Sequence, residues 1–162
     1  MTEQSARFAL PHIMAGQAQK EVWHNEALTL IDAALHPVAE TIGVNTPPGA
    51  PGLGECHIVG SAPTGAWTGK AAKLAAWTAG GWRFIAPITG MRVWLAAGNV
   101  YARWDGTAWQ QGVIAASAVH VGGVQVVGAR QGAIASLVGT NDMRDAINAM
   151  LAALRAHGLI AT

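Results

Sequence analysis

Two stretches with the same pattern decide the fold: LAAWTAGGWRF at residues 74–84 and YARWDGTAWQQ at residues 101–111. Each places a tryptophan, four turn-forming residues and a second tryptophan in the same order, and the two stretches are offset by 27 residues. Short turns containing Gly or Asp-Gly close β-hairpins, and residues that face each other across a hairpin have neighbouring side chains. We therefore predict two hairpins, one pairing Trp77 with Trp82 and the other pairing Trp104 with Trp109.

The β pattern extends beyond these two stretches. From Cys56 to about Val127 the sequence alternates with a period of two in short runs that are broken by Gly, Asn or Asp-Gly. This segment holds six of the seven tryptophans, although the whole chain has one tyrosine and two phenylalanines. A small core cannot enclose six indoles, so we expect some of them to be exposed or to lie at an interface.

Helices are predicted on both sides of the β segment. Residues from about Ala15 to Glu40 carry apolar side chains at intervals of three and four, which is typical of an amphipathic helix. The apolar positions are Val22, Trp23, Ala27, Leu30, Ile31, Ala34 and Leu35. Pro37 marks the end of this helix, and the proline- and glycine-rich stretch NTPPGAPGLGE at residues 45–55 forms a loop into the β segment.

The second helix is predicted from Asn141 to His157, with Asn141 as its N-cap. Four apolar residues form a seam with spacings of 4, 3 and 4: Met143, Ile147, Met150 and Leu154. Because two heptads cannot hold a coiled coil in water, the seam must lie against its own domain or against copies of itself. We expect a homo-oligomer, a trimer first and a pentamer second, with these four residues and Trp23 at the interface.

The predicted fold class is therefore α+β, with an N-terminal helix, a small antiparallel Trp-rich β-sheet or barrel, and a C-terminal helix. We predict three segments. Residues 1–44 form an N-terminal helical segment, residues 45–129 the Trp-rich β domain, and residues 130–162 a linker and C-terminal oligomerisation helix.

Charge is scarce and unevenly distributed. Charged residues make up 12% of the chain, which suggests a surface largely covered by partners, and the net charge is +1. Residues 1–55 carry a net charge of −4, whereas residues 56–104 carry +5 and no acidic residue. The apolar runs are too short to span a membrane and no secretory signal is recognisable, so we expect a soluble protein made in the cytosol, without membrane insertion.

The tryptophans and the nearby basic residues suggest a ligand. Indoles offer a flat apolar surface for sugar rings, and the basic segment suits an acidic polysaccharide. The candidate carbohydrate-binding residues are Trp77, Trp82, Trp104, Trp109, Arg83 and Arg103. A stand-alone carbohydrate-binding module is the alternative to a structural role. Nucleic acid is not expected, because the sequence has no dense run of Lys and Arg.

Catalytic motifs are lacking in the sequence. Glycoside hydrolysis uses a pair of carboxylates, and no acidic residue lies between Glu55 and Asp105. Those two could still converge in space, which keeps a glycan hydrolase open as a lesser alternative. Cys56 is the only cysteine and the six histidines are scattered, so neither a metal nor another cofactor is expected. We predict a protein that is not an enzyme, with Cys56 as a buried apolar residue.

Several strings resemble a family of phage-associated domains of unknown function. They are GQAQKEVWHNEALTLIDAAL, TPPGAPGLGECHIVG, TGAWTGKAAKLAAWTAGGWRF and VYARWDGTAWQ, which together run from about Phe8 to Gly112. The family is found in tail and fibre proteins of tailed phages and prophages of alphaproteobacteria and in gene transfer agents. The resemblance implies a virion component, the base or adaptor of a head spike or tail fibre, that contacts other virion proteins and cell-surface polysaccharide.

Overall fold

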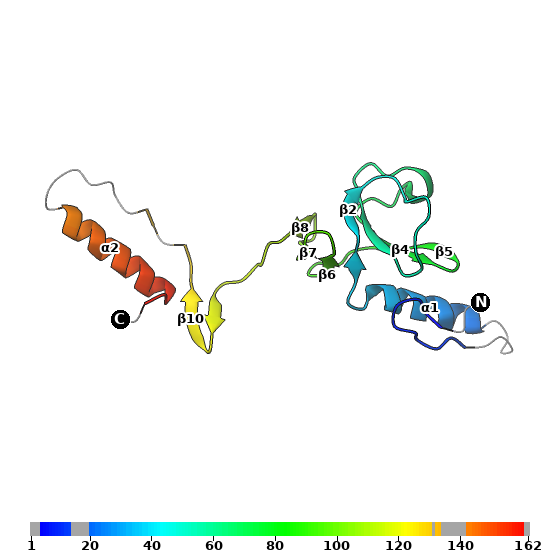
Figure 1. Ribbon diagram of the computed structural model, residues 1–162, viewed down its shortest axis with the longest axis horizontal. Coiled ribbons are helices and arrows are strands. Elements are labelled where there is room, and N and C mark those ends of the chain that lie inside the picture. The colour runs from blue at the N-terminus through cyan, green and yellow to red at the C-terminus, as the bar shows by residue number, and fades with distance from the viewer. Residues whose placement is uncertain (1–3, 14–19, 131, 134–141, 161–162) are drawn as a thin grey trace. The chain divides into compact units, whose positions relative to one another are not determined.

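The computed structural model describes residues 4–13, 20–130, 132–133 and 142–160. The chain divides into two compact units, an N-terminal unit that ends at Val113 and a C-terminal unit that begins at Ile114 (Figure 1). The predicted α+β class is confirmed, since a helix lies near each end and strands lie between them. The strands of the described residues form open sheets and no closed barrel. The three-segment division proposed above stays a prediction.

The N-terminal unit contains one helix, α1 (Lys20–Ala34), and two four-stranded sheets. The first sheet has the order β2 (Thr41–Val44), β3 (Cys56–Val59), β4 (Leu74–Thr78) and β5 (Gly81–Ile85). The second sheet has the order β1 (Val38–Ala39), β6 (Arg92–Leu95), β7 (Val100–Trp104) and β8 (Trp109–Gln111). A short 3₁₀ helix, η1 (Gly65–Trp67), lies in the loop between β3 and β4.

Both predicted hairpins are confirmed. Strands β4 and β5 pair with Trp77 opposite Trp82, and strands β7 and β8 pair with Trp104 opposite Trp109. The ring centroids are 5.1 Å apart in the first pair and 5.5 Å apart in the second, and both pairs meet edge to face. This arrangement suits the ring quadrupoles, so the paired indoles help to hold each hairpin in register.

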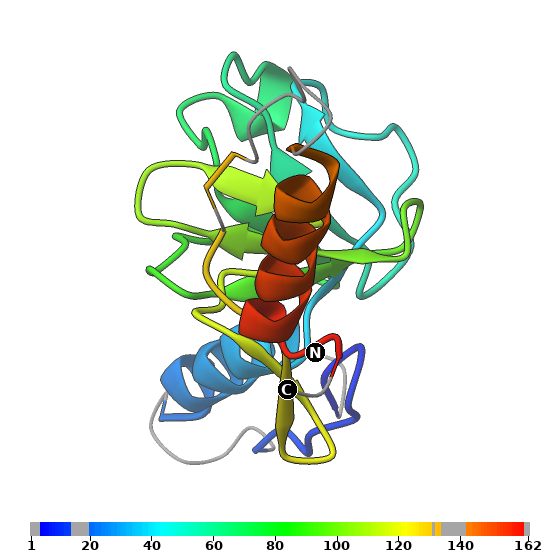
Figure 2. The same cartoon turned by 90° about the vertical axis from the view of Figure 1, so that its left-hand side faces the viewer.

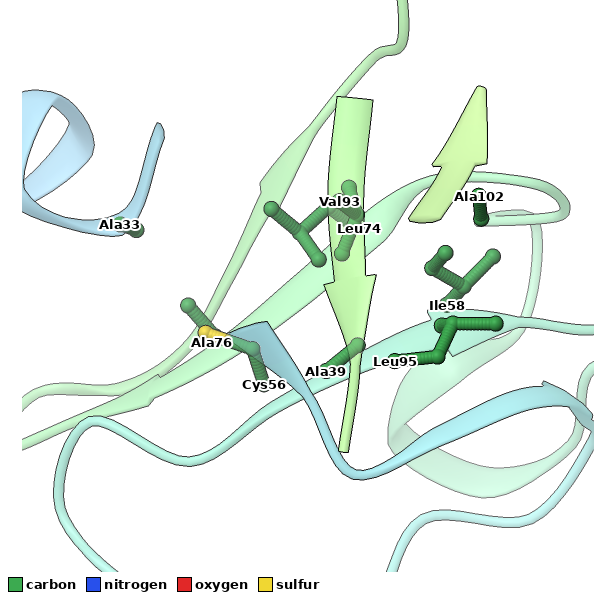
Figure 3. Packing of buried hydrophobic residues seen from close by; sticks show 9 residues of the cluster. All are labelled: Ala33, Ala39, Cys56, Ile58, Leu74, Ala76, Val93, Leu95 and Ala102. Atoms are coloured by element: carbon green, nitrogen blue, oxygen red, sulfur yellow. The ribbon is translucent and has the colours of Figure 1, made fainter. Parts of the chain in front are cut away.

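The core lies between the two sheets. Alternation along β3 and β4 turns Cys56, Ile58, Leu74 and Ala76 to one side, and all four are buried. They join Val93 and Leu95 of β6 and Ala102 of β7 in one apolar cluster (Figure 3). Ala33 of α1 and Ala39 of β1 complete it, so the cluster connects both sheets and the helix.

The first helix is shorter than predicted. Helix α1 ends at Ala34, three residues before its predicted end at Pro37, while residues 15–19 lie outside the described residues. His36 adopts a left-handed backbone with φ of 45°, and Pro37 has no N–H to continue the helix. The chain then turns extended, so that β1 pairs with β6 and β2 pairs with β3, both in parallel.

A buried carboxylate attaches residues 4–13, here called the N-terminal strap, to α1. The Asp32 carboxylate accepts hydrogen bonds from Ser5 Oγ at 2.7 Å, from Arg7 N at 2.9 Å and from Phe8 N at 2.6 Å. The Asn25 amide pairs with both the N–H and the C=O of Ile13. Hydrogen bonds to a charged acceptor are stronger than neutral ones, so Asp32 holds the strap most firmly.

Arg7, from the same strap, closes the C-terminal end of α1. Its guanidinium donates to the carbonyl oxygens of Asp32 at 2.7 Å, Leu35 at 3.0 Å and His36 at 2.7 Å. These carbonyls have no partner within the helix, because the last turn of any helix leaves its acceptors unused. The strap therefore supplies hydrogen-bond donors to the carbonyls at the end of α1 as well as holding the helix in place.

Helix α1 is oriented contrary to the usual rule for an amphipathic helix. Its polar residues Glu21, Asn25 and Asp32 are buried. Its large apolar residues Val22, Trp23 and Ile31 are exposed, and Trp23 is 80% exposed. An apolar stripe normally faces the core, so this helix is held by polar contacts and presents its apolar side outward.

The C-terminal unit consists of a hairpin, β9 (Val119–Val121) with β10 (Val124–Val127), and α2 (Asp142–His157). The predicted helix is confirmed up to His157, while its predicted N-cap, Asn141, lies outside the described residues. The end of α2 meets the hairpin, where Gly128 N donates to His157 Nδ1 at 3.2 Å (Figure 2). None of the described residues between Ile114 and Ile160 is buried.

Replacing Asp32 with alanine tests the role of the strap. The Asp32→Ala variant leaves three donors without their acceptor, and we expect it to lower the free energy of unfolding by about 2 to 4 kcal/mol. Urea unfolding followed by tryptophan fluorescence measures the change. Glu40→Ala, which removes an exposed carboxylate, is the matched control and should cost less than about 0.5 kcal/mol. Equal losses in the two variants would contradict the role given to Asp32.

Cys56 provides a second test, through pH. Burial raises the pKa of its thiol from 9.0 to about 11. The unfolded chain ionises at the lower pKa, so this contribution to stability is complete below pH 9 and is lost as the pH rises toward 11. The loss should amount to about 2 to 3 kcal/mol. We expect unfolding free energies to fall more steeply over this range for the natural chain than for Cys56→Ala, and parallel curves would refute the assignment.

Candidate functional site

The tryptophans of the β segment differ in burial. Trp67 is completely buried, whereas Trp77, Trp82, Trp94, Trp104 and Trp109 are each partly exposed. Trp67 packs between the rings of His57, at 5.6 Å, and Trp82, at 5.2 Å. The expectation that six indoles would not all fit in the core is therefore confirmed. Five of them keep some surface for a ligand or a partner.

The first hairpin separates its candidate residues. Trp77 and Trp82 are directly opposite each other and share one face of the sheet, together with His57 and Trp67. Arg83 follows Trp82 and pairs with Ala76, so its side chain leaves from the other face. There its Nε donates to Glu26 of α1 at 2.6 Å. The structure thus brings the two indoles together and directs the guanidinium toward α1.

The second hairpin makes the same separation. Trp104 and Trp109 share the face of Val93 and Ala102, which is the core side of the sheet. The Nε1 of Trp109 donates to the carbonyl oxygen of Ala72 at 2.8 Å, which anchors the loop before β4. Arg103 points to the opposite face, away from both indoles. The two Trp pairs therefore have structural contacts, and neither has its hairpin's arginine beside it.

Another set of side chains shares the outer face of the second sheet. Strands β6 and β7 place Arg92 opposite Arg103 and Trp94 opposite Tyr101. These four residues, here called the Arg–aromatic face, alternate with the buried Val93, Leu95 and Ala102. The Trp94 and Tyr101 rings meet edge to face, with centroids 4.9 Å apart.

Only Arg103 of these four residues is among the candidates predicted from the sequence, and the other three are not. A signal was present in the strings RVWL at residues 92–95 and YARW at residues 101–104. Each has a basic and an aromatic residue two positions apart, which places both on one face of a strand. What the strings do not contain is the register that sets Arg92 opposite Arg103.

The two acidic residues that could have formed a hydrolytic pair are both engaged locally. Glu55 accepts from His57 Nε2 at 2.8 Å with one oxygen and from Gly52 N at 2.7 Å with the other. Asp105 accepts from the backbone N–H groups of Thr107 and Ala108, and these bonds lower the pKa of its carboxyl group. Glu55 holds the loop before β3, and Asp105 closes the β7–β8 turn and remains ionised.

His57 is a buried and satisfied histidine. Its Nδ1 shares a hydrogen bond with Thr41 Oγ1 at 2.8 Å, while its Nε2 bonds Glu55. These bonds connect strand β2 to strand β3 and to the preceding loop, and the ring also packs against Trp67 and Trp82. Both ring nitrogens therefore have partners that explain the residue structurally.

A cavity of about 620 Å³ lies between the N-terminal strap, α1 and the β4–β5 hairpin. Trp77 and Arg83 contribute to its wall, as do Glu26, Asn25 and Asp32. Its size is typical of sites for small molecules. The charged groups of this wall are already paired, Arg83 with Glu26 and Arg7 with the carbonyls at the end of α1, so the cavity holds little unused charge.

Within the described part of the chain, His, Cys, Asp and Glu residues form no group of three or more that could hold a metal ion. No helix among the same residues has the length and apolar character needed to cross a bilayer.

Comparison with known proteins identifies a family for the chain. No curated protein matches the chain. A family model described as "Protein of unknown function (DUF2793)" matches residues 24–110, more than half of the chain. The match begins within α1, ends within β8 and includes the whole Arg–aromatic face, while the C-terminal unit lies outside it. The chain therefore belongs to the DUF2793 family of proteins of unknown function.

Proposed function

We propose that the chain is a non-enzymatic structural subunit of a phage or gene transfer agent particle, the base or adaptor of a head spike or tail fibre. Its C-terminal unit assembles it into a homo-oligomer, and its N-terminal unit faces other virion proteins and the polysaccharide of a recipient cell. The observation that carries the proposal is the absence of any buried side chain among the described residues of the C-terminal unit.

A hairpin and one helix cannot form a stable unit in water without apolar cover. A two-stranded hairpin is marginal by itself, and so is an isolated helix of 16 residues. Yet the seam residues Met143, Ile147, Met150 and Leu154 are all exposed, as are four valines of β9 and β10. The hydrophobic effect favours burial of these exposed apolar side chains. In a homo-oligomer, the same seam on a neighbouring copy of the chain can cover them. A threefold assembly suits the seam best, with a fivefold one second.

The exposed side of α1 offers a second contact surface. Trp23 and its apolar neighbours on this helix are fixed outward by the polar contacts of the strap. Exposed apolar patches on ordered elements usually mark sites of protein association. We assign this side of α1, which carries the predicted interface residue Trp23, to a contact with a neighbouring copy of the chain.

The particle setting is supported by the family resemblance of residues 8–112. The family-model match at residues 24–110 covers most of the same region. A subunit inside a particle has little free surface, which fits a chain in which only 12% of residues are charged.

The two alternatives fit the observations less well. A glycan hydrolase would need a free carboxylate pair, and the hydrogen bonds of Glu55 and Asp105 already occupy both candidates. A stand-alone carbohydrate-binding module would have no use for a C-terminal unit that exposes its apolar seam. The second alternative differs from our proposal in expecting a monomer.

A charge placed in the seam tests the assembly. Ile147→Asp would bury a carboxylate at the contact between copies, which is strongly unfavourable. We expect this variant to sediment as a monomer or to aggregate, whereas Asn148→Asp, which places the same charge on the neighbouring exposed position, should keep the natural sedimentation coefficient. If Ile147→Asp sediments like the natural chain, the α2 seam is not the assembly surface.

A further inference from the structure

The Arg–aromatic face combines two cations and two rings on one exposed surface. Arg92 is exposed, Tyr101 is 54% exposed, and Trp94 and Arg103 are partly exposed. The antiparallel register places the two arginines opposite each other and, two residues further along each strand, the two rings opposite each other. The four side chains therefore form a compact patch on neighbouring strands.

The electrostatics of this patch are unbalanced. Like charges directly opposite each other on neighbouring strands are unfavourable. Neither Arg92 nor Arg103 forms an ion pair with any described residue, and Arg103 Nε is buried without a hydrogen-bond partner among those residues. Asp105, two positions from Arg103, lies close enough for the Arg103 charge to help lower the pKa of its carboxyl group, but its hydrogen bonds go to Thr107, Ala108 and Gln110. An anion bound between the guanidiniums would relieve this repulsion.

The rings specify the kind of anion. Trp94 and Tyr101 meet at 74°, so their ring faces point in different directions. The partly positive C–H face of a pyranose ring lies well on the negative face of an aromatic ring. A carboxylate attached to such a ring would reach a guanidinium with the paired geometry that carboxylates and arginines favour.

We infer that the Arg–aromatic face binds a carboxylate-bearing pyranose unit of an acidic polysaccharide, with the carboxylate at Arg92 and Arg103 and the sugar ring at Trp94 and Tyr101. This inference rests on the proposed function, which brings the chain to a cell surface, and it adds a binding site and a ligand class. Nucleic acid is a poorer fit, because it calls for a longer basic stripe than two arginines provide.

Calorimetric titration of the full chain tests the site. The probes are an oligogalacturonate and its methyl ester, which keeps the sugar rings and removes the charge. We expect the acid form to bind at least about tenfold more tightly than the ester, since one charge-assisted contact accounts for roughly that factor. Arg103→Ala and Trp94→Ala should each weaken binding of the acid form about tenfold or more. Lys73→Ala removes one positive charge elsewhere in the same unit and should leave binding within about twofold, given the weakness of screened surface charges.

Several outcomes would overturn the inference. One is that the acid form does not bind at millimolar concentration, and another is that acid and ester bind with equal affinity. A third is that Lys73→Ala and Arg103→Ala lose equal affinity for the acid form. The last is that a single-stranded oligonucleotide binds more tightly than the acid form and depends on Arg103. Arg103→Lys checks folding, because it keeps the charge and the stem, and its urea midpoint should match that of the natural chain. Failure of the site would leave the oligomeric assembly untouched, whereas a monomeric chain that still bound the acid form would refute the structural role alone.

Discussion

The cross-strand contact of Trp77 with Trp82, and of Trp104 with Trp109, fixes the register of two hairpins, and the face assignments of the N-terminal unit follow from it. Side chains alternate along a strand. Once an indole pair lies on one face of a hairpin, every second residue along both strands therefore lies on that face too. In the second sheet, Trp104 and Trp109 share the core side, so Arg103 and its partner Arg92 must leave on the outer side. The same constraint that builds the core thus creates the Arg–aromatic face.

On α1, several polar side chains are buried and the large apolar side chains are exposed, which is the reverse of the usual arrangement. A buried aspartate and asparagine bind the N-terminal strap, and a guanidinium from the strap caps the helix. These directional contacts fix the rotation of α1, and they leave its tryptophan outward. In the C-terminal unit α2 likewise turns its larger apolar residues outward. Both helices therefore expose surface whose burial would stabilise an assembly, and the larger apolar cluster of the described residues lies between the two sheets.

Local patterns predicted the local elements well. The Trp-turn-Trp repeat carried enough information for both hairpins, and the 4, 3, 4 spacing with its N-cap predicted α2. The end of α1 and strands β1 and β2 were not predictable, because residues 38–44 become strands only by pairing in parallel with distant partners. The Arg–aromatic face was missed for a similar reason. Each strand showed its own alternation, but only the register between the strands reveals that Arg92 lies opposite Arg103 and that the two charges repel each other. Of the six candidate binding residues, Arg103 alone belongs to that face.

Copies of the chain that cover the exposed seam of α2 are the central feature of the proposed assembly. The most direct measurement is the mass of the purified full-length chain in solution by light scattering, made together with hydrogen exchange of the α2 amides. We predict a mass of three chains, or of five, with α2 amides protected. A single-chain mass with α2 amides equally protected would contradict the account, because the helix would then be stable without any copy to cover it.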